Sequence, residues 1–384
     1  MAGVRSMVAL ALGVVAFLGR SRLALAWDKD GHEAVGMTCM SALQKEATAQ
    51  VKHLMHGRDA SDVAGWGHKV NKKFPWTNQL HFQQQPSLLC KGADFSVCPG
   101  NRCLVSAMKY FYGKLTDAKV DEIDWGKGIT LTDADHVKYL INLIGDLHMP
   151  MHFTLDPKVD ARNMTATYNG KKMSLYDIWN AELAQAVIRE SPGFWLGGWT
   201  KVTRVQGDFE RDTKLWQQNG VKEFERWADQ TVNYLCHSIY RSNFDDSDAL
   251  PAMQAGTFVL SEETWNAWKQ EMLKKILVAG YRVAIVLNAV LQHREGKHEM
   301  HAGTAMRDVD ETEEDLERPP HIADILPRGS GSSRALTGVH AFLANLVIFS
   351  GVSVAFLQVM RYWRGKDAIS QADRAKNSAS GKGI

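Results

Sequence analysis

The chain has 384 residues, of which 45 are Lys or Arg and 43 are Asp or Glu, so its formal net charge is +2. This near-neutral balance excludes a protein that holds its partner mainly by bulk positive charge. Hydrophobic residues make up 45% of the chain and charged residues 23%, which excludes intrinsic disorder for most of the length.

The first 26 residues have the three parts of a secretory signal peptide. Arg5 supplies a charged start, the apolar run Met7–Leu18 is too short to span a bilayer, and Ala24–Ala26 is a small-x-small cleavage site. Cleavage at this site would make Trp27 the first residue of the mature chain. The alternative is an uncleaved amphipathic leader.

Between residues 27 and 295, hydrophobic side chains recur mainly at steps of three and four, the spacing of an amphipathic helix. Alternating patterns typical of strands are sparse, and we expect a short strand at Met164–Tyr168. Residues 193–201, with two tryptophans, are typical of a loop. We therefore predict one all-α, multi-helix domain over residues 27–295, large enough for a full core. Helices are predicted over Ala34–His56, Leu104–Leu115, Asp133–His148, Ser174 (as N-cap) to Glu190, Phe224–Tyr240 and Glu262–Gln292.

The segments after this domain are predicted to tether it. Residues 296–335 combine an acidic run, two prolines and a Gly-Ser stretch, which is typical of a linker. Residues 336–360 contain the uncharged run Ala341–Met360, which as a helix would cover about 30 Å, the hydrocarbon thickness. We predict a transmembrane helix there; the alternative is a buried core helix. Residues 361–384 are polar and basic, so the positive-inside rule keeps them cytoplasmic. The chain is therefore predicted to be a single-pass type I membrane protein of the secretory pathway, with a lumenal or extracellular domain.

Five cysteines occur, and in a secreted domain two pairs should form disulfides and leave one thiol. Cys98 and Cys103 are close enough in sequence to close a small loop, and Cys90 would then reach Cys236. Cys39 lies in an apolar helical run, which favours a buried thiol. A cysteine zinc site is the alternative, although the spacing fits no common thiolate pattern.

Histidines and carboxylates gather in a few short blocks. Asn142 and Asp146 are four residues apart, so they project from one helix face. Asp146 follows an apolar stripe, where burying a lone carboxylate is costly, and a metal ion shared with imidazoles is the simplest explanation. Pro150 should break the helix, so that His152 can turn back toward Asp146. The other blocks are Trp27–His32, Gly65–His68, Leu80–Phe82 and Ser174–Asn180.

Each of these residues has a plainer explanation when it is taken alone. His81 could be a surface or hydrogen-bonded core residue, Asp146 a cap or an ion-pair partner, and His148 an exposed side chain. The joint pattern is what favours a metal site.

Taken together, the blocks resemble the S1/P1 class I nucleases, zinc enzymes related in fold to zinc phospholipase C. The resemblance covers Trp27 to about His293 and implies a phospholipase C/P1 nuclease-like fold. It also implies the disulfides Cys90–Cys236 and Cys98–Cys103. The blocks that carry it, in the family's order, are Trp27 with Gly31-His32, Ala64–His68, Leu80–Phe82, Gly145–His152, the sequon Asn163–Thr165 and Ser174–Asn180.

The resemblance implies up to three Zn²⁺ ions. The first would be held by the amine and carbonyl of Trp27, by His32 and by Asp146. A freed α-amine can donate a lone pair to a metal, whereas a peptide nitrogen cannot, which gives the cleavage after Ala26 a chemical purpose.

Asp146 would bridge to a second ion, which His68, His81 and Asn142 would also hold. The family has Asp where this chain has His68, and His where it has Asn142. Imidazole still binds zinc, while an amide oxygen is a weak ligand.

The third ion would use His152 with the residues at positions 176 and 180. The family's His and Asp are replaced there by Tyr176 and Asn180, so His152 is the one strong ligand of this set.

The resemblance also implies the reaction and the residues that carry it. The family's transition-state Arg falls near Asn71, and Lys69 is the predicted substitute, so the predicted catalytic residues are Asp146 and Lys69. Phe82 matches the residue that stacks a nucleobase, and a family carboxylate falls at Gln84. The implied activity is zinc-dependent cleavage of single-stranded DNA or RNA, and of 3′-nucleotides, by a metal-activated water that leaves 5′-phosphorylated products.

Two other functions stay open. One is a degenerate family member, weakly active or inactive, that acts as a membrane-tethered binding protein; the other is phospholipase C-like hydrolysis of lipid head groups. The predicted partners are single-stranded nucleic acid or nucleotides and, through the C-terminal helix, a membrane; the sequence indicates no protein partner. Asn163 is a predicted glycosylation site, with an unused sequon as the alternative.

Overall fold

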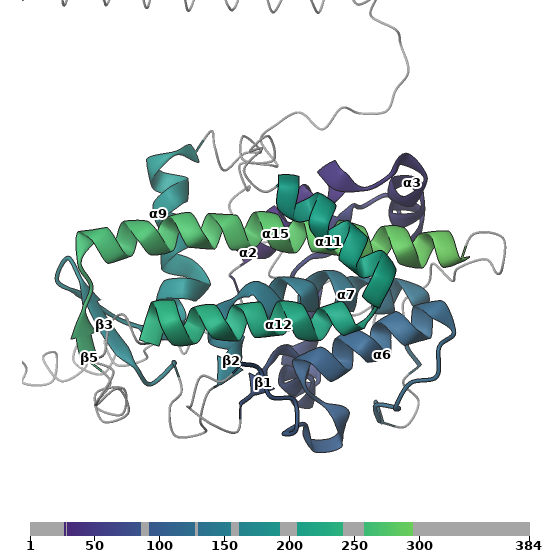
Figure 1. The fold of residues 1–384 in the computed structure, drawn as a ribbon, viewed down its shortest axis with the longest axis horizontal. Helices are drawn as coiled ribbons and strands as arrows, with labels where there is room; N and C mark the ends of the chain where they lie inside the picture. Colours follow the sequence, from purple (N-terminus) through teal and green to yellow (C-terminus); the bar gives the residue numbers. More distant parts are fainter. Residues whose placement is uncertain are drawn as a thin grey trace, which may run out of the picture. The chain divides into compact units, whose positions relative to one another are not determined.

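The computed structural model describes residues 27, 29–85, 92–126, 130–154, 161–192, 206–240 and 257–294. These residues are mainly helical (Figure 1), which confirms the main feature of the all-α prediction. The α-helices are α2 (Lys29–Ala42), α3 (Lys45–Leu54), α4 (Ala60–Val63), α5 (Trp66–Lys73), α6 (Leu104–Thr116), α7 (Asp133–His148), α8 (Leu175–Asp177), α9 (Leu183–Glu190), α11 (Gln206–Asn219), α12 (Lys222–Tyr234) and α15 (Glu262–Arg294). Short 3₁₀ segments are η2 (Pro75–His81), η3 (Pro99–Asn101) and η4 (Pro150–His152), and π-helical segments are η5 (Ile178–Glu182) and η8 (Leu235–Tyr240).

Helix α7 lies at the centre of the core. Every side chain from Ala134 to His148 is buried. The helix starts with a capping box in which the Thr132 side chain accepts from the Asp135 N–H and the Asp135 side chain accepts from the Thr132 N–H. It ends before Pro150, which has no N–H to continue the ladder. The predicted limits of this helix are therefore confirmed.

Helix α15 packs against α2, α7 and α11, and Figure 1 shows it beside these helices. The close approach of α15 to α2 depends on Gly280. A Cβ at this position would lie 2.3 Å from Thr38 Cβ and 2.7 Å from the Val35 carbonyl oxygen, so a larger residue would push the two helices apart. The contact fixes α2, and with it His32, relative to the core.

Two small sheets accompany the helices, so the all-α prediction needs this correction. In the first sheet β1 (Gln83–Gln84) pairs in parallel with β2 (Phe153–Thr154). In the second the order is β4 (Lys171–Ser174), β3 (Thr165–Tyr168), β5 (Thr257–Val259). Strand β3 confirms the predicted strand. Strand β4 begins with two lysines and β5 has three residues, so neither shows an alternating hydrophobic pattern.

The predicted helix Ala34–His56 is wrong as a single element. Helix α2 ends at Ala42 and α3 starts after Gln44, which has extended backbone and donates its N–H to Asn288 Oδ1 of α15. This contact between distant parts of the chain overrides the continuous helical pattern. The predicted Ser174 cap is confirmed, because its hydroxyl accepts from the Asp177 N–H at 2.9 Å.

The cysteines agree with the predicted framework as far as the structure describes them. Cys98 and Cys103 form a disulfide, Cys236 is disulfide-bonded, and Cys39 is a buried free thiol. Burial raises the pKa of that thiol. The expected partner Cys90 lies outside the described residues.

The predicted signal peptide (1–26), linker (296–335), transmembrane helix (336–360) and tail (361–384) also lie outside the described residues, as does the loop at 193–201. Among the residues that the structure describes, no helix is both long enough and apolar enough to cross a membrane.

Candidate metal centre

Four imidazoles surround one carboxylate at the centre of the domain. Asp146 lies in the last turn of α7, which contacts α2, α5, η2 and η4. Each of these elements contributes one histidine. All five side chains are at most 4% exposed: His32 from α2, His68 from α5, His81 from the end of η2, Asp146 from α7 and His152 from η4. We call these five residues the Asp146 cluster.

Three atoms of the cluster form an equilateral triangle. His32 Nε2, His68 Nε2 and Asp146 Oδ1 lie 3.2 Å from one another in all three pairs. Ligands at two corners of a zinc tetrahedron, each about 2.0–2.1 Å from the ion, are about 3.3 Å apart. The triangle therefore has the dimensions of three corners of such a site.

Hydrogen bonds fix the tautomers of the other two histidines. His81 Nδ1–H donates to Asp146 Oδ2 at 2.6 Å, and His152 Nδ1–H donates to the His81 carbonyl oxygen. Each ring is left with a lone pair on Nε2, the state in which imidazole binds a metal. His152 Nδ1 lies 4.0 Å from Asp146 Oδ1, as expected if Pro150 turns the chain back.

Burial favours the neutral forms of His68 and His152, whereas the neighbouring imidazoles favour the ionised form of Asp146. Burial, followed by the neighbouring His81, lowers the pKa of His68 to about 3, and burial lowers the pKa of His152 to about 4. For Asp146, burial alone would raise the pKa, but the surrounding imidazoles hold it well below its usual range. A buried negative charge among neutral rings favours a bound cation.

Several buried polar atoms at the cluster have no hydrogen-bond partner within the described part of the chain. They are His68 Nδ1, His81 Nε2, Asn142 Oδ1 and His152 Nε2. Buried polar atoms are almost always satisfied in native proteins, by protein, water or an ion. The donor set of imidazole nitrogen and carboxylate oxygen suits Zn²⁺, so the residues present fit the implied metal.

Two glycines leave the space that these side chains occupy. A Cβ at Gly67 would lie 2.2 Å from Asn142 Oδ1 and 3.0 Å from His81 Cε1, and a Cβ at Gly145 would lie 2.9 Å from the His32 ring. A larger residue at Gly67 would displace Asn142, and a larger residue at Gly145 would displace His32.

The other predicted ligands lie around this centre. Trp27 is fully buried, and its side chain lies against Gly31, next to His32. Asn142 is fully buried, with Nδ2 3.3 Å from His32 Nε2. Asn180 lies on η5, which contacts η4, and Asn180 Oδ1 is a buried oxygen without a hydrogen-bond partner among the described residues. Their binding of an ion stays a prediction.

The predicted substrate residues lie next to members of the cluster. The Phe82 ring stacks on His152 with 4.5 Å between centres and 2° between planes, and His152 is 6.3 Å from the Tyr176 ring. Lys69 is half-buried on α5, directly after His68. Asn71 is held by its neighbours, because its Oδ1 accepts from the Thr77 hydroxyl at 2.6 Å.

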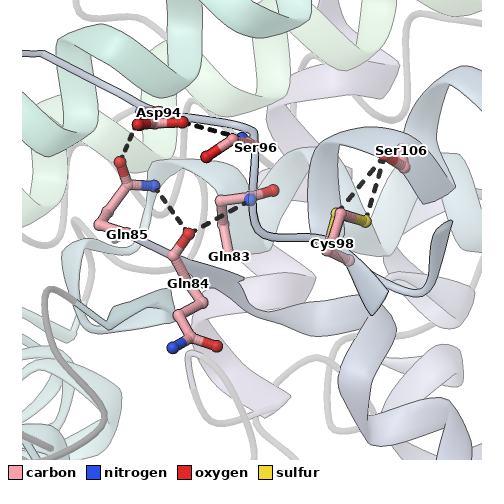
Figure 2. The surroundings of a disulfide bond; sticks show 8 residues. Gln83, Gln84, Gln85, Asp94, Ser96, Cys98 and Ser106 are labelled. Carbon is pink, nitrogen blue, oxygen red and sulfur yellow. Dashed lines mark hydrogen bonds between the residues drawn. A yellow bond between two sulfur atoms is a disulfide. The ribbon is translucent and has the colours of Figure 1, made fainter. Parts of the chain in front are cut away.

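The confirmed disulfide loop supports the segment that carries Phe82. Leu104, which follows Cys103, donates its N–H to the Phe82 carbonyl oxygen at 3.0 Å. Figure 2 shows the next residues of this segment beside the loop: the Asp94 N–H donates to Gln85 Oε1 at 2.7 Å. Both bonds hold the backbone segment that carries Phe82.

Sequence reasoning missed two features near the centre. His148 is buried, not exposed, and its Nε2 accepts from Arg282 Nη1 at 2.7 Å. Arg162 places its guanidinium over the Phe82 ring. His148 and Arg282 are 134 residues apart, and Phe82 and Arg162 lie in separate parts of the sequence. No short-range pattern therefore links either pair.

Comparisons with known proteins give a family match and two relatives. A family model described as S1/P1 Nuclease matches residues 27–292. Endonuclease 4 of Arabidopsis thaliana is 23% identical over 296 residues, which cover 73% of this chain and 93% of that protein. Endonuclease 1 of the same organism is 21% identical over 302 residues, 73% of this chain and 92% of that protein.

Proposed function

We propose that this chain, which belongs to the S1/P1 nuclease family, is a zinc-dependent endonuclease that cleaves single-stranded DNA or RNA and leaves 5′-phosphorylated products. 3′-Nucleotides are a further proposed substrate. The observation that carries the proposal is the triangle of His32 Nε2, His68 Nε2 and Asp146 Oδ1, with 3.2 Å sides. The endonuclease names of both Arabidopsis relatives support the same activity.

The first ion would be held by His32, His68 and Asp146, with the freed amine of Trp27 as a further ligand. This assignment places His68 with His32, because these two nitrogens share Asp146 Oδ1. When bound, zinc supplies an acidified water and a Lewis acid that neutralises phosphate charge.

A second ion would use the lone pair of His81 Nε2 with Asn142 Oδ1, two buried atoms without hydrogen-bond partners among the described residues. A third would rest on His152 Nε2 and Asn180 Oδ1. Because amide oxygens are weak zinc ligands, we expect occupancy to fall from the first of these sets to the third.

The chain's own residues orient the substrate. Phe82 offers an aromatic ring next to the centre, and stacking on such a ring is tolerant of base identity. Asp146 holds His81 in the tautomer that leaves Nε2 free of a proton. Lys69 is the proposed cation that stabilises charge on the phosphate.

We further propose that the domain is lumenal or extracellular, behind a signal peptide and ahead of a single membrane span. The match of the family model from residue 27 supports a mature chain that starts at Trp27. Asn163 is exposed, as a glycosylated asparagine has to be.

The test combines metal analysis with cleavage assays on the purified full chain. We expect bound zinc, together with cleavage of single-stranded DNA that EDTA abolishes and that leaves 5′-phosphate ends. His32→Ala should lose zinc and activity, while His53→Ala, which changes an exposed histidine on α3, should keep both. A protein without zinc or turnover would point to the binding function, and lipid hydrolysis without nuclease activity would point to the phospholipase.

A second experiment isolates the Trp27 amine. Blocking cleavage after Ala26 should remove activity while the helix content, read by circular dichroism, is kept, because the nitrogen would remain a peptide nitrogen without a lone pair to donate. Full activity in the uncleaved protein would refute the role of the amine.

A further inference from the structure

A basic side chain lies against the aromatic ring beside the Asp146 cluster. Arg162 Cζ is 5.5 Å from the centre of the Phe82 ring. That ring stacks on His152, and His152 Nδ1 is 4.0 Å from Asp146 Oδ1. The guanidinium therefore lies over Phe82, whose ring stacks directly on a member of the cluster.

The backbone holds Arg162 at this place. On one side the buried Ala161 accepts from the Tyr176 N–H at 3.1 Å, and on the other the buried Met164 accepts from the Leu175 N–H at 2.8 Å. Both bonds tie the Arg162 turn to the segment that carries Tyr176. The side chain itself is exposed, so it borders solvent.

We propose that Arg162 is a substrate-positioning residue that binds a phosphate of the nucleic acid strand next to the one cleaved at the Asp146 cluster. The inference rests on the proposed nuclease function. A guanidinium binds phosphate through two parallel hydrogen bonds, and its plane also stacks on aromatic rings.

Arg162 and Phe82 supply the two kinds of group that hold single strands, once the guanidinium moves from the ring to a phosphate and leaves that face to a base. Proteins that hold single strands pair cationic groups along the backbone with aromatic rings for the bases. With a net charge of only +2, the chain has little bulk positive charge to attract a strand, so individually placed cations should dominate the phosphate contacts.

The kinetic test compares Arg162→Ala with wild type on two substrates. For a single-stranded oligonucleotide we expect KM to rise about tenfold, the loss of one charge-assisted contact, with kcat within about twofold. For a 3′-mononucleotide, which has no neighbouring phosphate, both parameters should stay within about twofold. Arg189→Ala, which removes the same charge from an exposed position in the last turn of α9, should match wild type on both substrates.

The binding test does not depend on turnover. Fluorescence anisotropy of a labelled oligonucleotide is measured in EDTA at several salt concentrations. In Arg162→Ala the slope of log affinity against log salt should shrink by about 0.7, the value for one phosphate contact on a single strand. Arg162→Lys should keep the slope but lose part of the affinity, because an ammonium lacks the planar fork.

Three results would overturn the proposal: an unchanged oligonucleotide KM, an equal rise in KM for the mononucleotide, or an unchanged salt slope. An oligonucleotide that does not bind to the wild type would overturn it as well. If the strand binds through Arg162 and nothing is cleaved, the proposed nuclease function fails while the phosphate contact stands.

Discussion

The last turn of α7 contributes to two buried polar groups, one around Asp146 and one around His148. The charges in the two groups are balanced in different ways. At the first, Asp146 is surrounded by four imidazoles, and one nitrogen each of His68, His81 and His152 lacks a hydrogen-bond partner among the described residues. At the second, His148 Nδ1–H donates to the Ile144 carbonyl oxygen at 2.7 Å and Nε2 accepts from Arg282. No nitrogen of the second ring is left without a partner.

The second environment carries its own cation and anion. Arg282 Nε donates to Asp212 Oδ2 at 2.7 Å and Nη2 donates to Gln230 Oε1 at 2.6 Å, while Arg226 donates to the other Asp212 oxygen at 2.8 Å. We call these residues, with His148, the Arg282 network. Burial alone would raise the pKa of Asp212, but Arg282 and Arg226 lower it, so the carboxylate stays ionised.

The difference teaches how to tell a structural polar core from a metal site. In the Arg282 network an arginine supplies the positive charge, and its Nε, Nη1 and Nη2 each donate to an acceptor. In the Asp146 cluster the carboxylate has no arginine or lysine partner among its described contacts, and the ring nitrogens converge. The Asp146 cluster can therefore hold a cation from solution, which would be redundant in the Arg282 network.

The largest expected effect is the loss of the carboxylate at the cluster. Asp146→Asn keeps the size of the side chain but removes the negative charge that three imidazoles face. We expect zinc content to fall below detection and cleavage to fall by about 10³-fold or more, beyond the 10–100-fold typical of a residue that only supports a ligand. Metal analysis and single-turnover cleavage measure both.

The matched control for this variant lies two residues away. His148→Gln should keep the zinc content of wild type, because His148 belongs to the Arg282 network. Loss of zinc in both variants would mean that the two environments are not separate.

The second-largest effect is expected in the Arg282 network and not in the Asp146 cluster. Arg282→Met removes the cation between His148 and Asp212, and breaking a buried ion pair by removing one partner typically costs about 3–5 kcal/mol. We expect the free energy of unfolding, from urea denaturation, to fall by about that amount at unchanged zinc content. A variant as stable as wild type would show that the network contributes little to the fold.

The third effect concerns the space inside the cluster. In Gly67→Ala the new Cβ would lie 2.2 Å from Asn142 Oδ1, so the amide has to move. We expect zinc affinity to fall about tenfold, the lower end of the range for a supporting residue, as measured by competition with a chelator. Gly57→Ala is a poor control because Gly57 has a positive φ, whereas Gly207, with nothing within 4 Å of its Cβ position, is suitable. An unchanged affinity would argue against Asn142 as a ligand.

Sequence alone was sufficient for the parts of the site that lie within one element. The limits of α7 follow from the capping box of Thr132 and from Pro150, and the four-residue spacing places Asn142 and Asp146 on one face. The family pattern then pointed to His32, His68, His81 and their shared carboxylate. What the sequence could not give is the grouping of His68 with His32, which depends on how α2 and α5 pack against α7.

The Arg282 network shows the same limit of prediction from sequence. His148 follows Asp146 by two residues and has no local sign of burial, because Arg282 and Asp212 come from α15 and α11. Helix α5 was missed because it has eight residues, too few for a periodic pattern to stand out. The first failure concerns contacts between distant segments, which a single sequence does not reveal.

The smallest effect tests the charge balance of α15 beyond the network. Burial lowers the pKa of Lys275 to about 8, opposed by Glu271, whose Oε1 lies 3.6 Å away, and assisted by Arg282 and Lys274. The ammonium also lies 4.3 Å from the Tyr234 ring centre. The pKa of Lys275 therefore lies close to physiological pH.

The sign of its effect follows from the two states. In the folded protein Lys275 releases its proton near pH 8, whereas an unfolded lysine holds it to about 10.4. Between these values the unfolded state binds more protons, so the free energy of unfolding rises with pH. Lys275→Met should remove this rise, on the order of 1 kcal/mol, whereas Lys274→Met, an exposed neighbour, should keep it. Urea denaturation at pH 7.5 and pH 10 measures the change in the free energy of unfolding between these two pH values. An equal change in Lys275→Met and wild type would mean that Lys275 keeps its charge over this range.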